Sequence, residues 1–370
     1  MKKGRKILVL TFGDVLYDQR LIKTWKSLEQ SGYEVSVFAR KIFDERIDDL
    51  LHTVRCHPLF KKGMMAYVEY NVRAFFTLLF GRWRTVVSFD LDTLPAAVFV
   101  SYFKKIFIIH DAHEYFVESP ELVDRPKIRK IWEKIASFCI PKVDRAYTVG
   151  TSIAQAMQRE YGIPFEVIRN VPLISGTVDV ASEEMENFVP RPYIIYQGAL
   201  NTGRGLEQLI EVMVSFPGLN LALAGKGDIE PELKEKASML NLKNIHFVGN
   251  LRPPQLKAFT RNAVFGLNLL ENKGKSYYLS LANKFFDYIE AGIPQICVDF
   301  PEYRKLNDAY DIALLTESCV QELLREKFAM LLNDAVLYNR LKTNTSSAIN
   351  ELNWAQESRK LIELYDSWLQ

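Results

Sequence analysis

The sequence is short of the features that mark several classes of protein. Its 370 residues contain only 4 cysteines, and Cys56, Cys139, Cys297 and Cys319 form no closely spaced pair. Neither a thiolate metal site nor a disulfide framework is therefore expected, and the thiols are predicted to be buried in a reducing cytosol. With 18 glycines and 15 prolines, the composition excludes collagen-like repeats and long disordered tracts.

Long hydrophobic runs are also missing. The best candidate, Ala74–Phe80, is short and flanked by Arg73 and Arg82, whereas a membrane-spanning helix needs roughly 18 or more consecutive apolar residues. The first apolar run stops at Phe12, too early for the core of a signal peptide. We therefore expect a cytoplasmic protein without a transmembrane helix.

The chain has ample material for a hydrophobic core. It is 48% hydrophobic and 25% charged, and its length suggests two domains. The net charge of +2 hides an asymmetry, because residues 1–175 contain 27 Lys and Arg against 20 Asp and Glu, and the remainder contains 20 against 25. The basic half indicates an anionic partner, either a membrane surface or a nucleic acid. No aromatic and basic motif accompanies it, so nucleic acid is not expected.

Apolar runs alternate with helical patterns along the first half. This alternation predicts an α/β unit with a doubly wound parallel sheet. The predicted strands are Lys6–Phe12, Glu34–Ala39, Thr85–Phe89, Lys105–Ile109 and Arg145–Val149.

The same pattern restarts after a polar, acidic stretch, Leu173–Pro192, which we interpret as the linker. Predicted strands follow at Tyr193–Tyr196, Leu219–Ala224, Asn244–Val248, Val264–Leu269 and Pro294–Val298. The sequence thus predicts two Rossmann-like domains, 1–175 and 176–353, facing each other across a cleft. Because ligands bind beyond the carboxyl ends of such strands, the active site is expected to use both halves.

Titratable residues cluster directly after the predicted strand Lys105–Ile109. They are His110, Asp111, His113 and Glu114. The carboxyl end of a parallel strand is where substrates are handled, although a plain surface turn would give the same pattern. No third ligand has a spacing suited to zinc, so no metal is expected.

A glycine-rich turn, Gln197–Gly205, follows the first strand of the second half. Gly198 lets the backbone approach a ligand, and Arg204 supplies a guanidinium that matches phosphate. The turn is neither a P-loop nor a G-x-G-x-x-G motif, and an ordinary glycine turn is the alternative. Gly225 begins another such turn.

A predicted helix that begins at Asn283 carries charges of both signs. Lys284 and Asp287 are three residues apart and therefore lie on one helical face. There they would place a cation for phosphate beside a carboxylate for sugar hydroxyls, unless they simply form a salt bridge.

Together these motifs resemble those of the retaining glycosyltransferases of family four. The resemblance follows the chain in order through Asp18-Gln19-Arg20, Asp90-Leu91-Asp92-Thr93-Leu94-Pro95, His110–Glu114, Tyr196–Gly205, Asn283–Asp287 and Gly292-Ile293-Pro294. It implies the GT-B fold, with the acceptor on the N-terminal domain and a nucleotide-sugar of the UDP or GDP type on the C-terminal one. It also implies no metal or other cofactor, and a last helix, about 354–370, that packs back on the first domain.

The resemblance also implies roles for individual residues. His113 would be the active-site histidine, with His110 as second choice or as a residue that orients the loop. The implied donor-binding residues are Gly198, Arg204, Gly225, Val248, Asn283, Lys284 and Asp287. The implied acceptor-side residues are Gly13, Asp18, Arg20, Asp90, Asp92, Asp111 and Glu114.

Two positions depart from the family pattern. Ala199 stands where the family usually has a second basic residue for the diphosphate. Leu279 stands where it often has the first of two glutamates, and Asp287 replaces the second, the ribose ligand. Asn283 and Lys284 resemble the compensating pair of a subgroup that lacks the first glutamate.

The predicted function is transfer of a hexosyl group, with retention, from a nucleotide-sugar to a glycan or lipid-linked acceptor in surface polysaccharide or glycoconjugate synthesis. One alternative is a sugar-nucleotide epimerase on the same scaffold. The other is a non-catalytic glycan-binding homologue, which the departures at Ala199 and Leu279 would fit.

A possible membrane segment, Met64–Phe80, has apolar residues at helical spacing between Lys61-Lys62 and Arg82-Trp83-Arg84. These apolar residues are Val68, Val72, Phe75, Phe76 and Leu79. The flanking cations favour a helix on the inner face of an anionic membrane. A buried core helix would show the same apolar face and is the preferred interpretation of this segment.

Overall fold

The computed structural model describes residues 6–13, 15, 18–41, 52–119, 122, 125–174 and 189–369. Most of the predicted linker lies outside these residues. The chain divides into two compact units, Met1–Asn170 with Ala355–Gln370, and Val171–Trp354. Among the described residues, no helix is both long and apolar enough to cross a membrane.

Unit 1 is built on a seven-stranded sheet, in the order β3-β2-β1-β4-β5-β6-β7. Its strands are β1 (Lys6–Leu10), β2 (Glu34–Arg40), β3 (His52–Cys56), β4 (Thr85–Phe89), β5 (Phe107–Ala112), β6 (Arg145–Thr148) and β7 (Glu166–Val167). All pairs are parallel. The strand order reverses between β1 and β4, and in sheets of this type ligands bind beyond the carboxyl ends of the strands at such a point.

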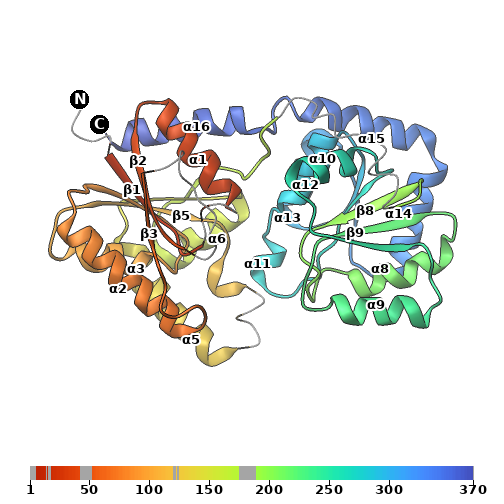
Figure 1. The fold of residues 1–370 in the computed structure, drawn as a ribbon. Helices are drawn as coiled ribbons and strands as arrows, with labels where there is room; N and C mark the ends of the chain where they lie inside the picture. The colour runs from red at the N-terminus through yellow and green to blue at the C-terminus, as the bar shows by residue number, and fades with distance from the viewer. Residues whose placement is uncertain are drawn as a thin grey trace. The chain divides into compact units, whose positions relative to one another are not determined.

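Helices cover both faces of this sheet, which explains why its central strands are continuous apolar runs. The helices are α1 (Gln19–Gln30), α2 (Met64–Phe80), α3 (Leu94–Ser101), α5 (Pro126–Cys139), α6 (Thr151–Tyr161) and α16 (Trp354–Trp368). Helices α2, α3 and α5 lie on one side, and α1 and α16 on the other (Figure 1).

Strand β5 differs from the prediction. The sequence predicts its end at Ile109, but its ladder continues, with His110 opposite Ser88 of β4 and Asp111 opposite Tyr147 of β6. The predicted strand end is therefore three residues too early, and His110 and Asp111 lie within the strand. The hydrophobic pattern stops at Ile109 because these polar side chains find partners inside the unit, which the pattern does not reveal.

Helix α16 belongs to unit 1 although unit 2 separates it from the rest in sequence. Tyr365 is fully buried, and its hydroxyl lies 3.2 Å from that of Tyr147. Glu357 accepts a hydrogen bond of 3.0 Å from the Arg169 backbone N–H. At the ends of unit 2, the Trp354 N–H donates to the Pro172 carbonyl at 2.8 Å.

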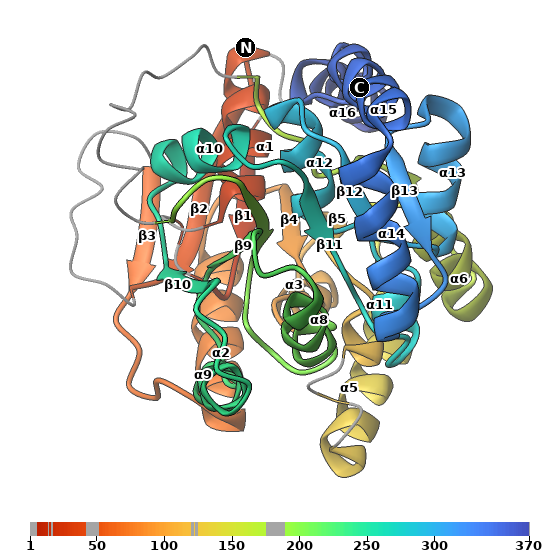
Figure 2. The same cartoon turned by 90° about the vertical axis from the view of Figure 1, so that its right-hand side faces the viewer.

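Unit 2 has a six-stranded parallel sheet, in the order β10-β9-β8-β11-β12-β13. The strands are β8 (Tyr193–Gln197), β9 (Asn220–Ala224), β10 (Ile245–Gly249), β11 (Gly266–Asn268), β12 (Gln295–Val298) and β13 (Ala313–Thr316). Its helices are α8 (Leu206–Val212), α9 (Glu230–Met239), α10 (Pro253–Arg261), α11 (Lys275–Tyr278), α12 (Asn283–Ala291), α13 (Pro301–Tyr310), α14 (Gln321–Asn333) and α15 (Ala335–Ala348). Helices α8 and α9 lie on one face, and α10 and α12 on the opposite face (Figures 1 and 2).

Candidate functional site

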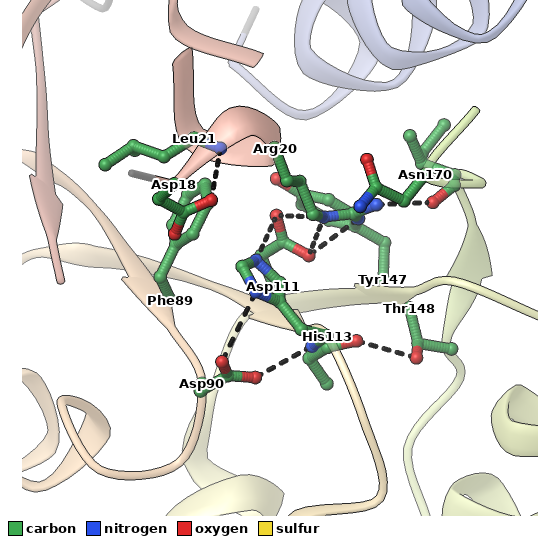
Figure 3. Close-up of polar contacts among 12 residues, drawn as sticks. Asp18, Arg20, Leu21, Phe89, Asp90, Asp111, His113, Tyr147, Thr148 and Asn170 are labelled. Carbon is green, nitrogen blue, oxygen red and sulfur yellow. Dashed lines mark hydrogen bonds and ion pairs between the residues drawn. The ribbon is translucent and has the colours of Figure 1, made fainter. Parts of the chain in front are cut away.

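A buried ion pair stands at the end of β5 in unit 1. Asp111 is fully buried, and Arg20 of α1 approaches it with Nε 3.1 Å from Oδ2 and Nη2 2.8 Å from Oδ1 (Figure 3). Arg20 Nη1 donates to the Ile168 carbonyl at 2.9 Å. Burial alone would raise the pKa of Asp111, but Arg20 and His113 hold it well below its usual range. This carboxylate is therefore a fixed negative charge.

His113 lies between two carboxylates just after β5. Its Nδ1 is 3.3 Å from Asp90 Oδ2, and its Nε2 is 3.6 Å from Asp111 Oδ2 (Figure 3). Its backbone N–H donates to Asp90 Oδ1 at 2.8 Å, and Phe89 meets the ring edge to face. Asp90 adopts a left-handed φ of 58°, a conformation that Asp tolerates better than most residues. The turn after β4 thus aims a carboxylate at the turn after β5.

The two carboxylates make His113 a cation near neutral pH. Burial alone would lower its pKa, but Asp90 and Asp111 outweigh burial and raise the pKa to about 9. A charged imidazole with 21% of its side chain exposed suits electrostatic stabilisation or proton donation rather than proton abstraction.

This pKa predicts a pH-dependent contribution to stability. The folded pKa of about 9 exceeds the ordinary value of 6.5, so the stabilisation is complete below about pH 6.5 and is lost as the pH rises through 9. We expect His113→Gln to cost about 2 kcal/mol more at pH 6 than at pH 10 in urea unfolding. His57→Gln, at an exposed histidine, is the control. A pH-independent cost for His113→Gln would contradict the assignment.

His110 faces the interior. It is 1% exposed, its Nδ1 lies 3.4 Å from the Ser88 carbonyl, and burial lowers its pKa to about 4. A neutral buried imidazole fits the role of orienting the strand end better than contact with a substrate.

The other predicted acceptor-side residues differ in how far they are buried. Asp18 is the N-cap of α1, where its Oδ1 accepts from the Leu21 N–H at 2.9 Å. Burial and Asp90 raise the pKa of Asp92, which is partly buried. Gly13 and Glu114 are exposed, beyond β1 and β5 respectively. The role of each as an acceptor ligand stays a prediction.

In unit 2, two glycine turns are packed back to back. The Gly198 N–H donates to the Ala224 carbonyl at 2.9 Å. Gly225 has a φ of 151°, and a Cβ there would lie 2.0 Å from the Gly198 oxygen. Only glycine fits at this position, so these turns bring backbone, rather than side chains, to the ends of β8 and β9.

Lys284 reaches these turns from α12 without a hydrogen-bonding partner among the described residues. It is 5% exposed, and its buried Nζ makes no hydrogen bond. The ammonium lies 3.8 Å from the centre of the Tyr196 ring, and a Cβ at Gly198 would lie 3.7 Å from it. Burial lowers the pKa of Lys284 well below its usual range, and Arg204 lowers it further.

Arg204 forms the second cation of this site. Its guanidinium lies 5.6 Å from the Tyr277 ring centre, and its buried Nε makes no hydrogen bond within the described part of the chain. Two cations held beside glycine backbone, with unused donors, form an arrangement that fits a diphosphate. The sequence indicated the two cations and the segment Tyr196–Gly205, but not that the rings of Tyr196 and Tyr277 adjoin the cations.

The remaining donor-side residues line the same edge of the sheet. Asp287 does not bridge to Lys284, because it accepts from Gln197 Nε2 at 2.7 Å and Lys284 Nζ has no bonded partner in the described residues. Asn283 is exposed at the first turn of α12. Val248 lies in β10 just before Gly249, whose φ is 68°.

Comparisons with known proteins identify the fold. Residues 180–348, which form most of unit 2, match the family model described as Glycosyl transferases group 1. No curated protein matches the chain. Among solved structures, sucrose-phosphate synthase from Thermosynechococcus elongatus is similar with a TM-score of 0.81 at 18% identity, and 98% of each chain is covered. The fold is GT-B.

Other GT-B structures resemble the chain over its whole length. HepE from Anabaena, in complex with UDP and glucose, has a TM-score of 0.76 at 15% identity, covering 98% of this chain and 100% of that one. WaaG, a glycosyltransferase involved in lipopolysaccharide biosynthesis, has a TM-score of 0.71 at 13% identity, with 97% and 99% covered. In the GT-B framework, the two candidate sites stand at the carboxyl ends of the strands of two Rossmann-like units.

Proposed function

We propose that this protein is a retaining glycosyltransferase of the family four type, which moves a hexosyl group from a nucleotide-sugar to an acceptor. The observation that carries the proposal is the buried, unbonded ammonium of Lys284 beside Gly198 and Arg204. An unpaired buried cation is costly to keep, and a bound diphosphate would supply the missing charge. The match to Glycosyl transferases group 1 supports the same conclusion.

The donor would bind to unit 2 through charge and backbone. Lys284, Arg204 and the Gly198 turn stabilise the diphosphate as it leaves the anomeric carbon, and Asp287 and Asn283 bind sugar hydroxyls. The loop after Val248 holds the base. This chemistry uses cations that the protein itself supplies in place of a metal ion. In the described residues no group of three or more His, Cys, Asp or Glu is arranged for a metal.

The acceptor would bind to unit 1, at Gly13, Asp18, Asp90, Asp92 and Glu114. His113, charged and held between carboxylates, is the residue we place at the reacting centre. The acceptor hydroxyl forms the new bond to the anomeric carbon while the bond to the diphosphate breaks, and the hydroxyl proton passes to the leaving phosphate.

Product analysis tests this function. Wild-type protein with UDP- or GDP-hexose and acceptor is expected to release nucleoside diphosphate and a glycoside of unchanged anomeric configuration, by NMR. His113→Ala should lose about 2 to 4 decades of turnover, whereas His57→Ala should lose none, and a chelator should change neither. An inverted product would contradict retention. An epimerised nucleotide-sugar without transfer would favour the epimerase, and binding without turnover the non-catalytic homologue.

We further propose that the protein acts peripherally on the inner face of a membrane, in surface polysaccharide or glycoconjugate synthesis. On α2 the predicted apolar face is open, since Val68, Val72 and Phe76 are 47%, 49% and 50% exposed. The side that packs on the unit consists instead of Ala66, Tyr70, Ala74 and Leu78. Three of the five residues that the sequence singled out are thus about half exposed, which a fully buried core helix would not show, while Phe75 and Leu79 are partly buried.

Vesicle sedimentation checks the membrane proposal. Because each basic residue near an anionic surface contributes about 1 kcal/mol, binding should appear with anionic vesicles at low salt and weaken as salt increases. Neutral vesicles are the control. Equal partitioning to both vesicle types would contradict the proposal.

A further inference from the structure

An apolar groove runs along the face of unit 1 formed by α2, α3 and α5. Its volume is about 640 Å³, which lies within the range of small-molecule sites, about 300 to 1,000 Å³. Val72 and Phe76 of α2 and Phe99 of α3 line it, each about half exposed. Trp132 of α5 forms part of the wall. Figure 1 shows the three helices on the same side of the sheet.

One polar group that borders the groove, the side-chain amide of Asn71, is already bonded. Asn71 donates from Nδ2 to the Asp92 carbonyl at 2.8 Å and accepts at Oδ1 from the Ala96 N–H at 3.0 Å. The groove therefore offers hydrocarbon surface and no free amide from Asn71, which favours an alkyl chain over a sugar as occupant.

The wall of the groove contacts the segments that hold two of the acceptor-side residues, Gly13 and Asp92. Tyr67, in its wall, stacks on Phe12 with ring centres 4.2 Å apart, and Phe12 immediately precedes Gly13 at the end of β1. Asn71, in the same wall, is bonded to Asp92 after β4. One molecule can therefore lie with its polar end at these strand ends and its apolar end along α2.

Cations line a neighbouring hollow on α5, whose Phe138 ring lies 6.0 Å from the Phe99 ring of the groove. The lining of this hollow includes three exposed lysines, Lys127, Lys130 and Lys134, and one acidic residue, Glu133. Such a hollow suits an amphiphile that is presented by an anionic lipid surface.

We propose that this groove binds the hydrocarbon chain of a lipid-linked acceptor, whose head group lies at the residues beyond β1 and β4. The proposal rests on the proposed transferase function and specifies its acceptor as an amphiphile. Four observations support it: the open apolar walls, the bonded amide of Asn71, the contacts of the wall with Phe12 and Asp92, and the lysines on α5.

Tryptophan quenching by a monomeric amphiphile tests the groove. The probe is an alkyl maltoside with a brominated chain, kept below its critical micelle concentration so that no bilayer or micelle is present. Wild type should show saturable quenching, and Trp132→Phe should lose most of it. Val72→Glu should weaken binding at least 10-fold, whereas the matched control Val336→Glu, at a residue 80% exposed in unit 2, should not.

Three results would overturn the groove proposal. They are no saturable quenching in wild type, quenching in Val72→Glu equal to that in wild type, and binding of the protein to anionic vesicles without binding of the monomeric amphiphile. Calorimetry with UDP and GDP separates this test from that of the transferase. If UDP or GDP binds but the amphiphile does not quench tryptophan fluorescence, the groove proposal is overturned and the proposed transferase function is not. Kinetics of the active protein give a second test. In wild type the KM for the acceptor should fall as its alkyl chain lengthens, with kcat unchanged, and in Val72→Glu the KM should not depend on chain length. A wild-type KM that is independent of chain length would also overturn the proposal.

Discussion

Replacing Lys284 by methionine is expected to weaken nucleoside diphosphate binding by about 1.5 to 4 decades while making the free protein more stable. The two effects have one cause, the buried ammonium that makes no hydrogen bond within the described residues. Methionine keeps the apolar stem and removes the group that is costly to bury, which should stabilise the free protein by about 1 to 3 kcal/mol. Loss of a buried charged contact should cost the complex about 2 to 5 kcal/mol.

Calorimetric titration with UDP and GDP measures the first effect, and urea unfolding without nucleotide measures the second. Lys243→Met, at an exposed lysine of the same unit, is the control and should change neither. Burial and Arg204 lower the pKa of Lys284 in the free protein, and a bound diphosphate, as an anion, should raise this pKa again. Nucleotide affinity should therefore fall as the pH rises through the lowered pKa. If Lys284→Met is less stable than wild type and still binds nucleotide, Lys284 contributes to the core and not to nucleotide binding.

Arg20→Met is expected to lower the free energy of unfolding by about 3 to 5 kcal/mol. It leaves the carboxylate of Asp111, which is 0% exposed, without its bidentate partner. Removing both charges, in Arg20→Met with Asp111→Leu, should recover much of the loss because no uncompensated charge remains buried. Arg145→Met, at an exposed arginine of the same unit, serves as the control in urea unfolding.

NMR titration of His113 gives a readout that packing alone would not change. Arg20 lowers the pKa of His113 by repulsion, so Arg20→Met should raise that pKa above its wild-type value. An unchanged pKa, or a double variant less stable than either single one, would show that the pair does not act as a charge unit.

The framework of the fold follows from short-range pattern. The predicted strand Thr85–Phe89 coincides with β4, and the segment Met64–Phe80 coincides with α2. Both are strong signals, because Thr85–Phe89 is a continuous apolar run between turns and the helical spacing of apolar residues in Met64–Phe80 extends over a long segment. Strand β3 escapes prediction, because its sequence His-Thr-Val-Arg-Cys lacks an apolar run.

The electrostatics of the site could not be predicted in the same way. Arg20 and Asp111 are 91 positions apart, and only the sheet topology brings them together. The sequence likewise indicates that Lys284 and Asp287 share a helical face, but not that Lys284 is buried while Asp287 pairs with Gln197. Such partnerships depend on which elements are neighbours in space, and hydrophobic periodicity carries no information about them.

The return of α16 to unit 1 sets the order in which the chain can fold during synthesis. Unit 2, Val171–Trp354, is one uninterrupted stretch whose ends are joined by the Trp354–Pro172 hydrogen bond. Unit 1 is begun first, yet Tyr147 and Tyr33 acquire their partners Tyr365 and Asp366 only when α16 has left the ribosome. The unit that is translated first is thus the last to be completed, and its open face must remain soluble while all of unit 2 is made.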